Sequence, residues 1–252
     1  MASTSDLKST NTTKNKSLVS ETGHNKNVAN FSTAYQILKE MGSLYNPSNA
    51  NIKLENLNPI SVSLQSVIAE FNNKKPLYKN AVAAREVAIA PLSKLMTKST
   101  NFAKSLNISA PDKENIVNQA KKIRGDQKPK KVNPDTSESE SISTSQLSYD
   151  SRIANLDSYI NQLASHPQYD PNEQEIQIQT FQALHSKLVS LSQTVNAAGN
   201  SLITARKNRN EILYNNEINV LQLMKDIKAY LKSLGDGGKP YYNAVVRLKF
   251  RN

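Results

Sequence analysis

Three histidines, His24, His166 and His185, are the side chains best suited to metal binding or proton transfer near neutral pH. None of them stands in an HExxH motif or at another spacing typical of a metal site, and no carboxylate pair recurs with them. The chain also lacks cysteine, which excludes disulfides, thiol catalysis and zinc–thiolate sites. We therefore expect no metal, no cofactor and no catalytic residue, and we predict that the protein is not an enzyme.

A glycine cluster offers a second possible chemistry. Gly235, Gly237 and Gly238 lie close to Lys239, which would suit phosphate binding. The cluster follows a helical pattern, however, and the carboxyl end of a helix carries partial negative charge that repels phosphate. The alternative is a helix C-cap, which needs the left-handed backbone that glycine adopts easily. We predict that a helix ends near Gly235.

Basic side chains could bind phosphates or carboxylates. The chain has 32 lysine and arginine residues against 21 aspartate and glutamate residues, giving a formal net charge of +11 at pH 7. This balance permits binding to nucleic acid, to an anionic membrane or to an acidic protein, and it does not choose among them. From their clustering we predict the following interaction residues: Lys74, Lys75, Lys79, Lys94, Lys98, Lys104, Lys121, Lys122, Arg124, Arg206, Arg209, Lys228 and Lys232.

A purely structural interpretation of these residues stays open. Lysines often cover a solvated helix face without any partner. Arg85, Arg206 and Arg209 lie on or beside an apolar seam, where long arginine side chains pair across a helical bundle or extend to its surface.

Two long apolar seams define the elements that would position these residues. Apolar side chains recur at steps of three and four from Leu57 to Leu95 and again from Phe181 to Ile212. These steps place the side chains on one helical face, as in a coiled coil. Shorter helices are predicted at about 28–44 and 148–165. Asn46-Pro47 and Asp170-Pro171, in the turns that follow the short helices, suit helix starts. The first long helix is predicted at about 53–106.

Both long helices are weakened at corresponding places. Pro76 and Gly199 disfavour a helix within the stretches 72–76 and 196–200. Either each helix kinks there or it folds back as a hairpin. Because the seam stays in phase across the break, we favour a kinked but continuous helix, with a further kink at Pro91.

The sequence repeats itself. LMTKSTNFAKSL from Leu95 resembles LMKDIKAYLKSL from Leu223 at an offset of 128, and Tyr45-Asn46-Pro47 resembles Tyr169-Asp170-Pro171 at an offset of 124. Matches in the same order predict a tandem duplication of a unit of roughly 120 residues. The offset grows by four residues, about one helical turn, so we expect the helix to continue through the insertion.

The predicted fold is all-α: an elongated antiparallel helical bundle built from a tandem duplication of a short-helix plus long-helix unit. We expect a flexible tail at 1–27, a first repeat at 28–124, a flexible linker at 125–146 and a second repeat at 147–252. Since the sequence shows no apolar signal region and no long uncharged apolar run, we expect a cytoplasmic address, with leaderless export left open.

The second copy contains a string of residues that is similar to a known group. The string consists of Ala205-Arg206, Arg209-Asn210, Leu213-Tyr214, Lys228, Tyr230, Lys232-Ser233, Gly235, Tyr242, Val245, Leu248 and Phe250. It resembles a group of uncharacterised helical proteins of Bacteroidota-type bacteria. The resemblance implies a bacterial helical protein, cytosolic or secreted, and brings no catalytic residues.

Three functions fit these observations. The first is a structural or protein-interaction scaffold, with a protein partner or self-association. The second is a nucleic-acid-associated protein that uses the Lys/Arg face. The third is a membrane-active, pore-former-like protein that inserts Ala81–Leu92 into an anionic bilayer. No small-molecule substrate is expected.

Overall fold

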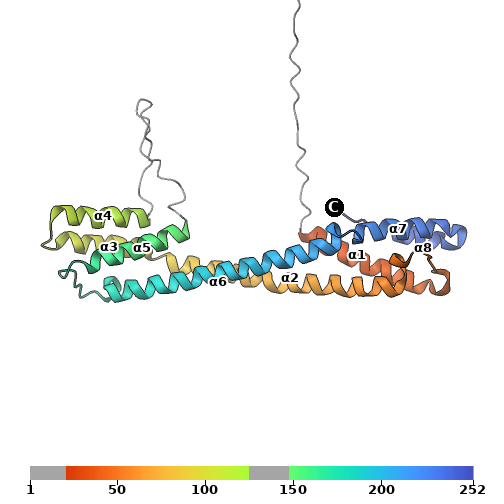
Figure 1. The fold of residues 1–252 in the computed structure, drawn as a ribbon, viewed down its shortest axis with the longest axis horizontal. Helices are drawn as coiled ribbons and strands as arrows, with labels where there is room; N and C mark the ends of the chain where they lie inside the picture. Colours follow the sequence, from red (N-terminus) through yellow and green to blue (C-terminus); the bar gives the residue numbers. More distant parts are fainter. Residues whose placement is uncertain (1–20, 125–147, 252) are drawn as a thin grey trace, which may run out of the picture. The chain divides into compact units, whose positions relative to one another are not determined.

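The computed structural model describes residues 21–124 and 148–251 (Figure 1). Every regular element within these ranges is helical, which confirms the predicted all-α fold. The α-helices are α1 (Glu21–Glu40), α2 (Leu54–Ile89), α3 (Leu92–Ser105), α4 (Ala110–Arg124), α5 (Tyr149–Ala164), α6 (Ile178–Asn210), α7 (Val220–Ser233) and α8 (Gly235–Arg247). Short 3-10 turns occur at Gly42–Leu44, Ala50–Ile52 and Gln174–Ile176, and a π-helical turn occurs at Glu211–Asn215.

The chain is divided into two compact units that do not follow the order of the sequence. Unit 1 combines the residues up to Phe71 with those from Ala205 onward, and unit 2 comprises Asn72–Thr204. Helices α2 and α6 each contribute residues to both units. The predicted repeats, 28–124 and 147–252, are therefore not the two compact units, because each unit draws on both repeats.

Unit 1 packs α1 and the start of α2 with α7 and α8. The helices α7 and α8 form a hairpin, and α1 packs against α8. Leu57, Leu64 and Phe71 lie seven residues apart on α2 and are all buried, as the seam predicts. The core consists of Val28, Phe31, Ala34, Leu38, Met41, Tyr45, Ile52, Leu57, Leu64, Leu213, Val220, Leu223, Met224, Ile227, Leu231 and Val245.

Unit 2 packs α3, α4 and α5 side by side, together with most of α6 (Figure 1). On α6, Phe181, Leu188 and Val195 are buried at the same seven-residue spacing. The core consists of Ala88, Ile89, Leu92, Met96, Ala103, Ile116, Ala120, Ile123, Ile153, Leu156, Tyr159, Ile160, Leu163, Tyr169, Ile176, Phe181 and Leu188.

Helix α2 begins at Leu54, close to the predicted start at about 53, and α6 begins at Ile178. Asn46-Pro47 and Asp170-Pro171 have the chemistry of helix starts, but no helix begins at either pair. In each case a 3-10 turn intervenes, and a tyrosine hydroxyl fastens it. Tyr45 donates to the carbonyl of Ile52 at 2.6 Å, and Tyr169 donates to the carbonyl of Ile176 at 2.9 Å.

Helix α2 is interrupted at Ala90-Pro91, where a further kink was predicted, and neither long helix ends within 72–76 or 196–200. Helix α2 runs through Pro76 and ends before Ala90-Pro91, and α6 runs through Gly199, so the fold-back alternative is wrong. Contrary to the expectation, the helix does not continue through the region where the repeat offset changes: α2 ends at Ile89, and α6 ends at Asn210 before the π-helical turn and Asn216–Asn219. Asn219 then caps α7 by accepting a hydrogen bond from the backbone N–H of Gln222 at 3.0 Å.

The chain ends also differ in part from the predictions. Helix α1 already begins at Glu21, so the tail prediction is wrong for residues 21–27, while 1–20 and the predicted linker lie outside the described residues. Gly235 has a φ of +62°, in agreement with the predicted helix end. A new helix, α8, begins at that glycine.

Candidate functional site

Most of the predicted interaction residues lie in unit 2. Lys74, Lys75 and Lys79 are on α2; Lys94, Lys98 and Lys104 are on α3; Lys121, Lys122 and Arg124 are on α4. Arg206, Arg209, Lys228 and Lys232 belong to unit 1. The structure therefore does not gather the predicted residues into one site within either unit.

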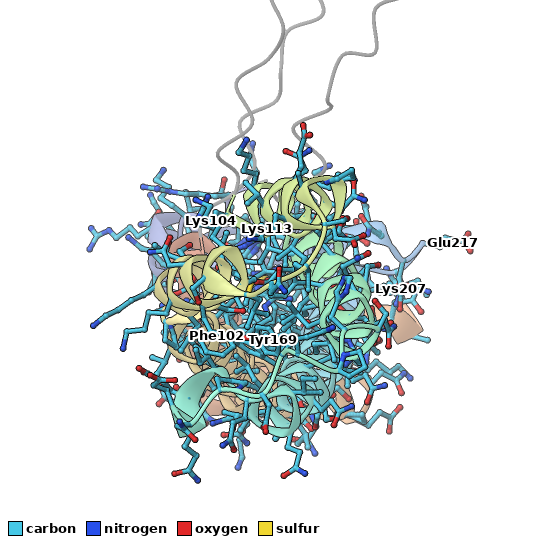
Figure 2. The ribbon with its side chains drawn as sticks, turned by 90° about the vertical axis from the view of Figure 1, so that its left-hand side faces the viewer. Phe102, Lys104, Lys113, Tyr169, Lys207 and Glu217 are labelled. Carbon is cyan, nitrogen blue, oxygen red and sulfur yellow. The ribbon has the colours of Figure 1, made fainter. Side chains whose placement is uncertain are left out.

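The α3–α4 hairpin presents part of the basic group. Lys94, Lys98 and Lys104 are exposed, and Lys98 forms an ion pair with Glu175. Lys104 lies near the end of α3 and Lys113 near the start of α4 (Figure 2). The cations at the other end of α4 are less accessible, because Lys121, Lys122 and Arg124 are partly buried. Arg124 donates from Nη1 to the hydroxyl of Thr97 at 3.1 Å.

Arg209 is a structural residue of unit 1. Its side chain is 2% exposed, and its guanidinium lies 5.0 Å from the centroid of the Phe71 ring. Nε and Nη2 both donate to Oδ1 of Asn210, at 3.1 and 3.0 Å. The inclusion of Arg209 in an accessible interaction surface is therefore wrong. Arg206 is exposed, with its guanidinium 5.8 Å from the same ring.

The hairpin of α7 and α8, here called the C-terminal hairpin, contains the remaining predicted interaction residues, Lys228 and Lys232. Lys232 is exposed, whereas Lys228 is partly buried with Nζ 5.7 Å from the ring centroid of Phe250. Burial, and secondly the nearby charge of Lys249, lowers the pKa of the Lys228 ammonium. Lys228 is thus partly withdrawn from solvent by packing.

The histidines take different positions. His24, which the sequence placed in the tail, is buried in α1, and its Nδ1 lies 2.8 Å from the hydroxyl of Tyr214. His166 follows α5, where Nε2 lies 3.3 Å from the amide nitrogen of Gln162. In the described parts of the chain no cluster of three or more histidine, aspartate or glutamate side chains could hold a metal ion.

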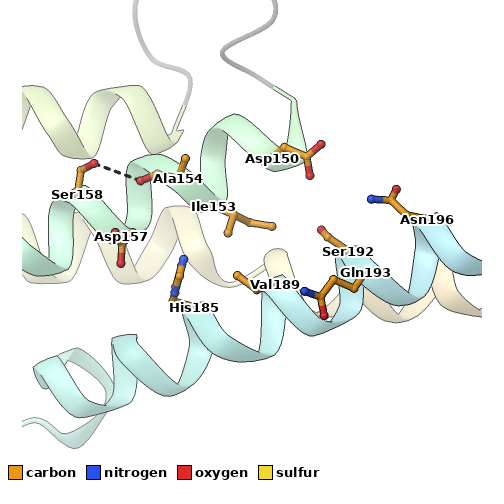
Figure 3. Close-up of a pocket in the computed structure, with 10 residues that line it drawn as sticks. All are labelled: Asp150, Ile153, Ala154, Asp157, Ser158, His185, Val189, Ser192, Gln193 and Asn196. Carbon is orange, nitrogen blue, oxygen red and sulfur yellow. Dashed lines mark hydrogen bonds between the residues drawn. The ribbon is translucent and has the colours of Figure 1, made fainter.

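His185 lines an open groove between α5 and α6 in unit 2, with a volume of about 650 Å³ (Figure 3). Asp150 and Asp157 come from α5, while Ser192 joins His185 on α6. Ser192 is buried, points from α6 toward α5, and its hydroxyl has no hydrogen-bond partner. The groove offers carboxylates, an imidazole and a hydroxyl to a small polar molecule. The sequence predicts both helices and their packing, but it does not indicate which of their polar side chains line the space between them.

An exposed apolar stripe on α2 was also missed. Leu77 is 57% and Val87 75% exposed, and Ala84 between them is exposed as well. The steps from 77 to 84 and from 84 to 87 place all three on one helical face. The stripe lies beside the predicted seam, to which Ala81 and Arg85 of the same helix belong.

The segment predicted to insert into a membrane contributes part of its apolar side chains to the core of unit 2. Ala81, Ala88, Ile89 and Leu92 are buried, whereas Ala83, Ala84, Val87 and Ala90 are exposed. Over residues 21–124 and 148–251, no helix combines the length and apolar character needed to cross a bilayer. Comparisons with protein-family models, with curated proteins and with solved structures found no match.

Proposed function

We propose that the protein is a non-enzymatic scaffold that binds a partner protein along the exposed face of α2 in unit 2. The observation that carries this proposal is the apolar stripe of Leu77, Ala84 and Val87. Single exposed apolar residues are common on protein surfaces and need no explanation. Three on one helical face form a row of the kind that a partner helix covers.

The charge beside the stripe indicates the kind of partner. From residue 72 to residue 87, α2 contains Lys74, Lys75, Lys79 and Arg85 and a single acidic residue, Glu86. Two copies of this segment would repel each other, whereas an acidic partner would be attracted. The stripe and its lysines together fit an amphipathic helix that places apolar side chains on Leu77 and Val87 and carboxylates opposite the lysines.

Capture from the native cell lysate tests this proposal. The intact protein should retain a partner that is lost in the double variant Leu77→Asp/Val87→Asp. Val62→Asp is the matched control, since Val62 is a 58% exposed apolar residue of α2 that lies in unit 1. Circular dichroism should show unchanged helicity in all three proteins. If the double variant captures the same proteins as the intact chain, the stripe is not the binding surface.

A second candidate, association with nucleic acid, is favoured by the composition of the C-terminal hairpin. Residues 220–251 contain only two acidic side chains, Asp226 and Asp236. Against them stand the basic residues Lys225, Lys228, Lys232, Lys239, Arg247, Lys249 and Arg251. Tyr241 and Tyr242 are partly exposed among them and could stack on unpaired bases.

Titration of fluorescent double-stranded DNA and single-stranded RNA over a range of salt concentrations tests this second candidate. Binding through phosphates must weaken steeply as salt rises. Lys232→Glu/Lys239→Glu should weaken it further. Lys207→Glu is the control, because Lys207 is already paired with Glu211 at 3.7 Å. Absence of binding at low salt removes this candidate.

A further inference from the structure

Each compact unit is built from both halves of the chain. In unit 1, α1 and the start of α2 belong to the first half and the α7–α8 hairpin belongs to the second. In unit 2, α5 and most of α6 belong to the second half and the α3–α4 hairpin belongs to the first. In each unit, helices from one half of the chain (residues 21–124 or 148–251) therefore pack with the C-terminal hairpin of the other half.

An aromatic contact between the two halves of the chain occurs in each unit. The rings of Tyr45 and Tyr230 meet edge to face, with centroids 5.3 Å apart and planes at 85°. The rings of Tyr169 and Phe102 meet at 5.3 Å and 89° (Figure 2). The offsets of 124 and 128 pair Tyr45 with Tyr169 and Phe102 with Tyr230. One contact is thus made twice, each time between residues of different halves.

A polar contact recurs in the same manner at the end of each half. In unit 1 the side-chain nitrogen Nδ2 of Asn27 donates to the backbone carbonyl of Arg251 at 2.7 Å. In unit 2, Nε of Arg152 donates to the carbonyl of Ile123 at 2.9 Å. The offset of 125 pairs Asn27 with Arg152, and the offset of 128 pairs Ile123 with Arg251. Different side chains reach the same backbone position.

Corresponding core positions show a size exchange. In unit 2 the large side chain of Tyr159 meets the small Ser99, with the two hydroxyls 2.8 Å apart. The positions that correspond to them in unit 1 are Ala34 and Ile227, and both are buried in its core. Each unit thus has one large and one small buried residue at these two positions, and the large residue lies on α5 in unit 2 but on α7 in unit 1.

We propose that residues 21–124 and 148–251 are two equivalent but non-identical protomers joined in one chain, each binding the C-terminal hairpin of the other. The partner that each half fits is therefore a second copy of the same helical unit, supplied here by the other half. The sizes of Ala34, Ser99, Tyr159 and Ile227 favour the pairing of each half with the hairpin of the other half. If each half bound its own hairpin, Ala34 would meet Ser99 and leave a cavity, and Tyr159 would meet Ile227 and overpack.

Cleavage of the full chain tests the pairing. A protease site is inserted between residues 125 and 147, and the folded protein is cut and passed over a sizing column with light scattering. The two fragments should elute together at the mass of the uncut chain and separate only in denaturant. Fragments that separate as folded monomers under native conditions overturn the proposal, because the halves would then be self-contained.

Exchange of core sizes tests the equivalence of the two units. Ser99→Ile should lower the unfolding midpoint of the uncut chain, because isoleucine overpacks against Tyr159. Adding Tyr159→Ala reproduces the Ala34 and Ile227 pair of unit 1 and should restore most of the loss. Tyr169 keeps its bond to Ile176 in the double variant, as Tyr45 keeps its bond to Ile52.

If the double variant is no more stable than Ser99→Ile alone, the correspondence of these positions is wrong. As a control for general effects of removing a tyrosine, Tyr159→Ala alone should be less stable than the double variant. Neither experiment involves Leu77 or Val87, so its outcome is independent of the partner proposed for α2.

Discussion

The ring of Tyr45 lies edge to face against the ring of Tyr230, and the Tyr45 hydroxyl is bonded to the carbonyl of Ile52. Tyr45 therefore holds its own turn and contacts α7 at the same time. Tyr230 contributes a second bond, since its hydroxyl accepts the backbone N–H of Asn46 at 3.0 Å. The turn before α2 and the hairpin of α7 and α8 are thus joined through two rings.

A double-mutant cycle measures this contact. Tyr45→Leu and Tyr230→Leu should each destabilise the protein, and the double variant should lose less than the sum by about 0.5–1.5 kcal/mol, the usual value for an aromatic pair. The cycle on Tyr169 and Phe102 should give a similar coupling. Urea unfolding provides the free energies, and strict additivity in both cycles would contradict a direct ring contact.

Two buried serines of unit 2 should respond in opposite ways to alanine. Ser99 bonds to the hydroxyls of Tyr159 and Tyr169, so Ser99→Ala should cost about 1–2 kcal/mol. The hydroxyl of Ser192 has no partner, so Ser192→Ala should stabilise the protein by about 0.5–1 kcal/mol. Urea midpoints of the two variants check this. A loss of stability in Ser192→Ala would indicate that a bound molecule or water satisfies the hydroxyl.

Two arginines near one ring should differ in their contribution to stability. Arg209 is buried beside Phe71 and bonded to Asn210, so Arg209→Ala should cost about 2–4 kcal/mol. Arg206 is exposed at a longer distance from the same ring, so Arg206→Ala should cost less than about 1 kcal/mol. Thermal melts followed by circular dichroism compare them. Equal losses would mean that burial of Arg209 carries no special energy.

The protein should lose stability in alkali. Burial raises the pKa of Tyr45, Tyr159 and Tyr169 above the ordinary value of 10.0. Above pH 10 the unfolded chain releases these protons while the folded protein retains them, so each tyrosine lowers the free energy of unfolding by about 1.4 kcal/mol per pH unit. Below pH 10 the effect is absent.

Absorbance of tyrosinate and far-ultraviolet circular dichroism, recorded on the same alkaline titration, follow this loss. Ionisation of the buried tyrosines should coincide with the loss of helicity. Complete ionisation with the helices intact would show that these hydroxyls are accessible to solvent in the folded protein.

The helices could be predicted because side-chain periodicity is a local property. The spacing of Leu57, Leu64 and Phe71 places them on one face whatever else the chain does, and all three are buried. The turns that precede the long helices could not be predicted by the same means. Asn46-Pro47 has the chemistry of a helix start, but the bond from Tyr45 to Ile52 fixes a 3-10 turn there instead.

The candidate site was less accessible to sequence reasoning. Clustered lysines were visible, yet the burial of Arg209 and the exposure of Leu77 depend on which faces other helices cover. His24 and Asn27 were assigned to a polar tail because their neighbours are polar, and both are buried. Pairs such as Tyr159 with Ser99 do carry a size signal, but it becomes readable only when the partner helices are known.

Unit 1 is formed by two separate segments of the chain, and this affects when it can fold during synthesis. Unit 2 is one uninterrupted stretch, Asn72–Thr204, whereas unit 1 needs both its first helix and residues near the carboxyl end, such as Val245. On a ribosome the chain emerges amino end first, and domains fold when their residues become available. Helix α1 leaves the exit tunnel before α7 and α8, so Phe31 and Leu38 stay uncovered until those two helices have been synthesised.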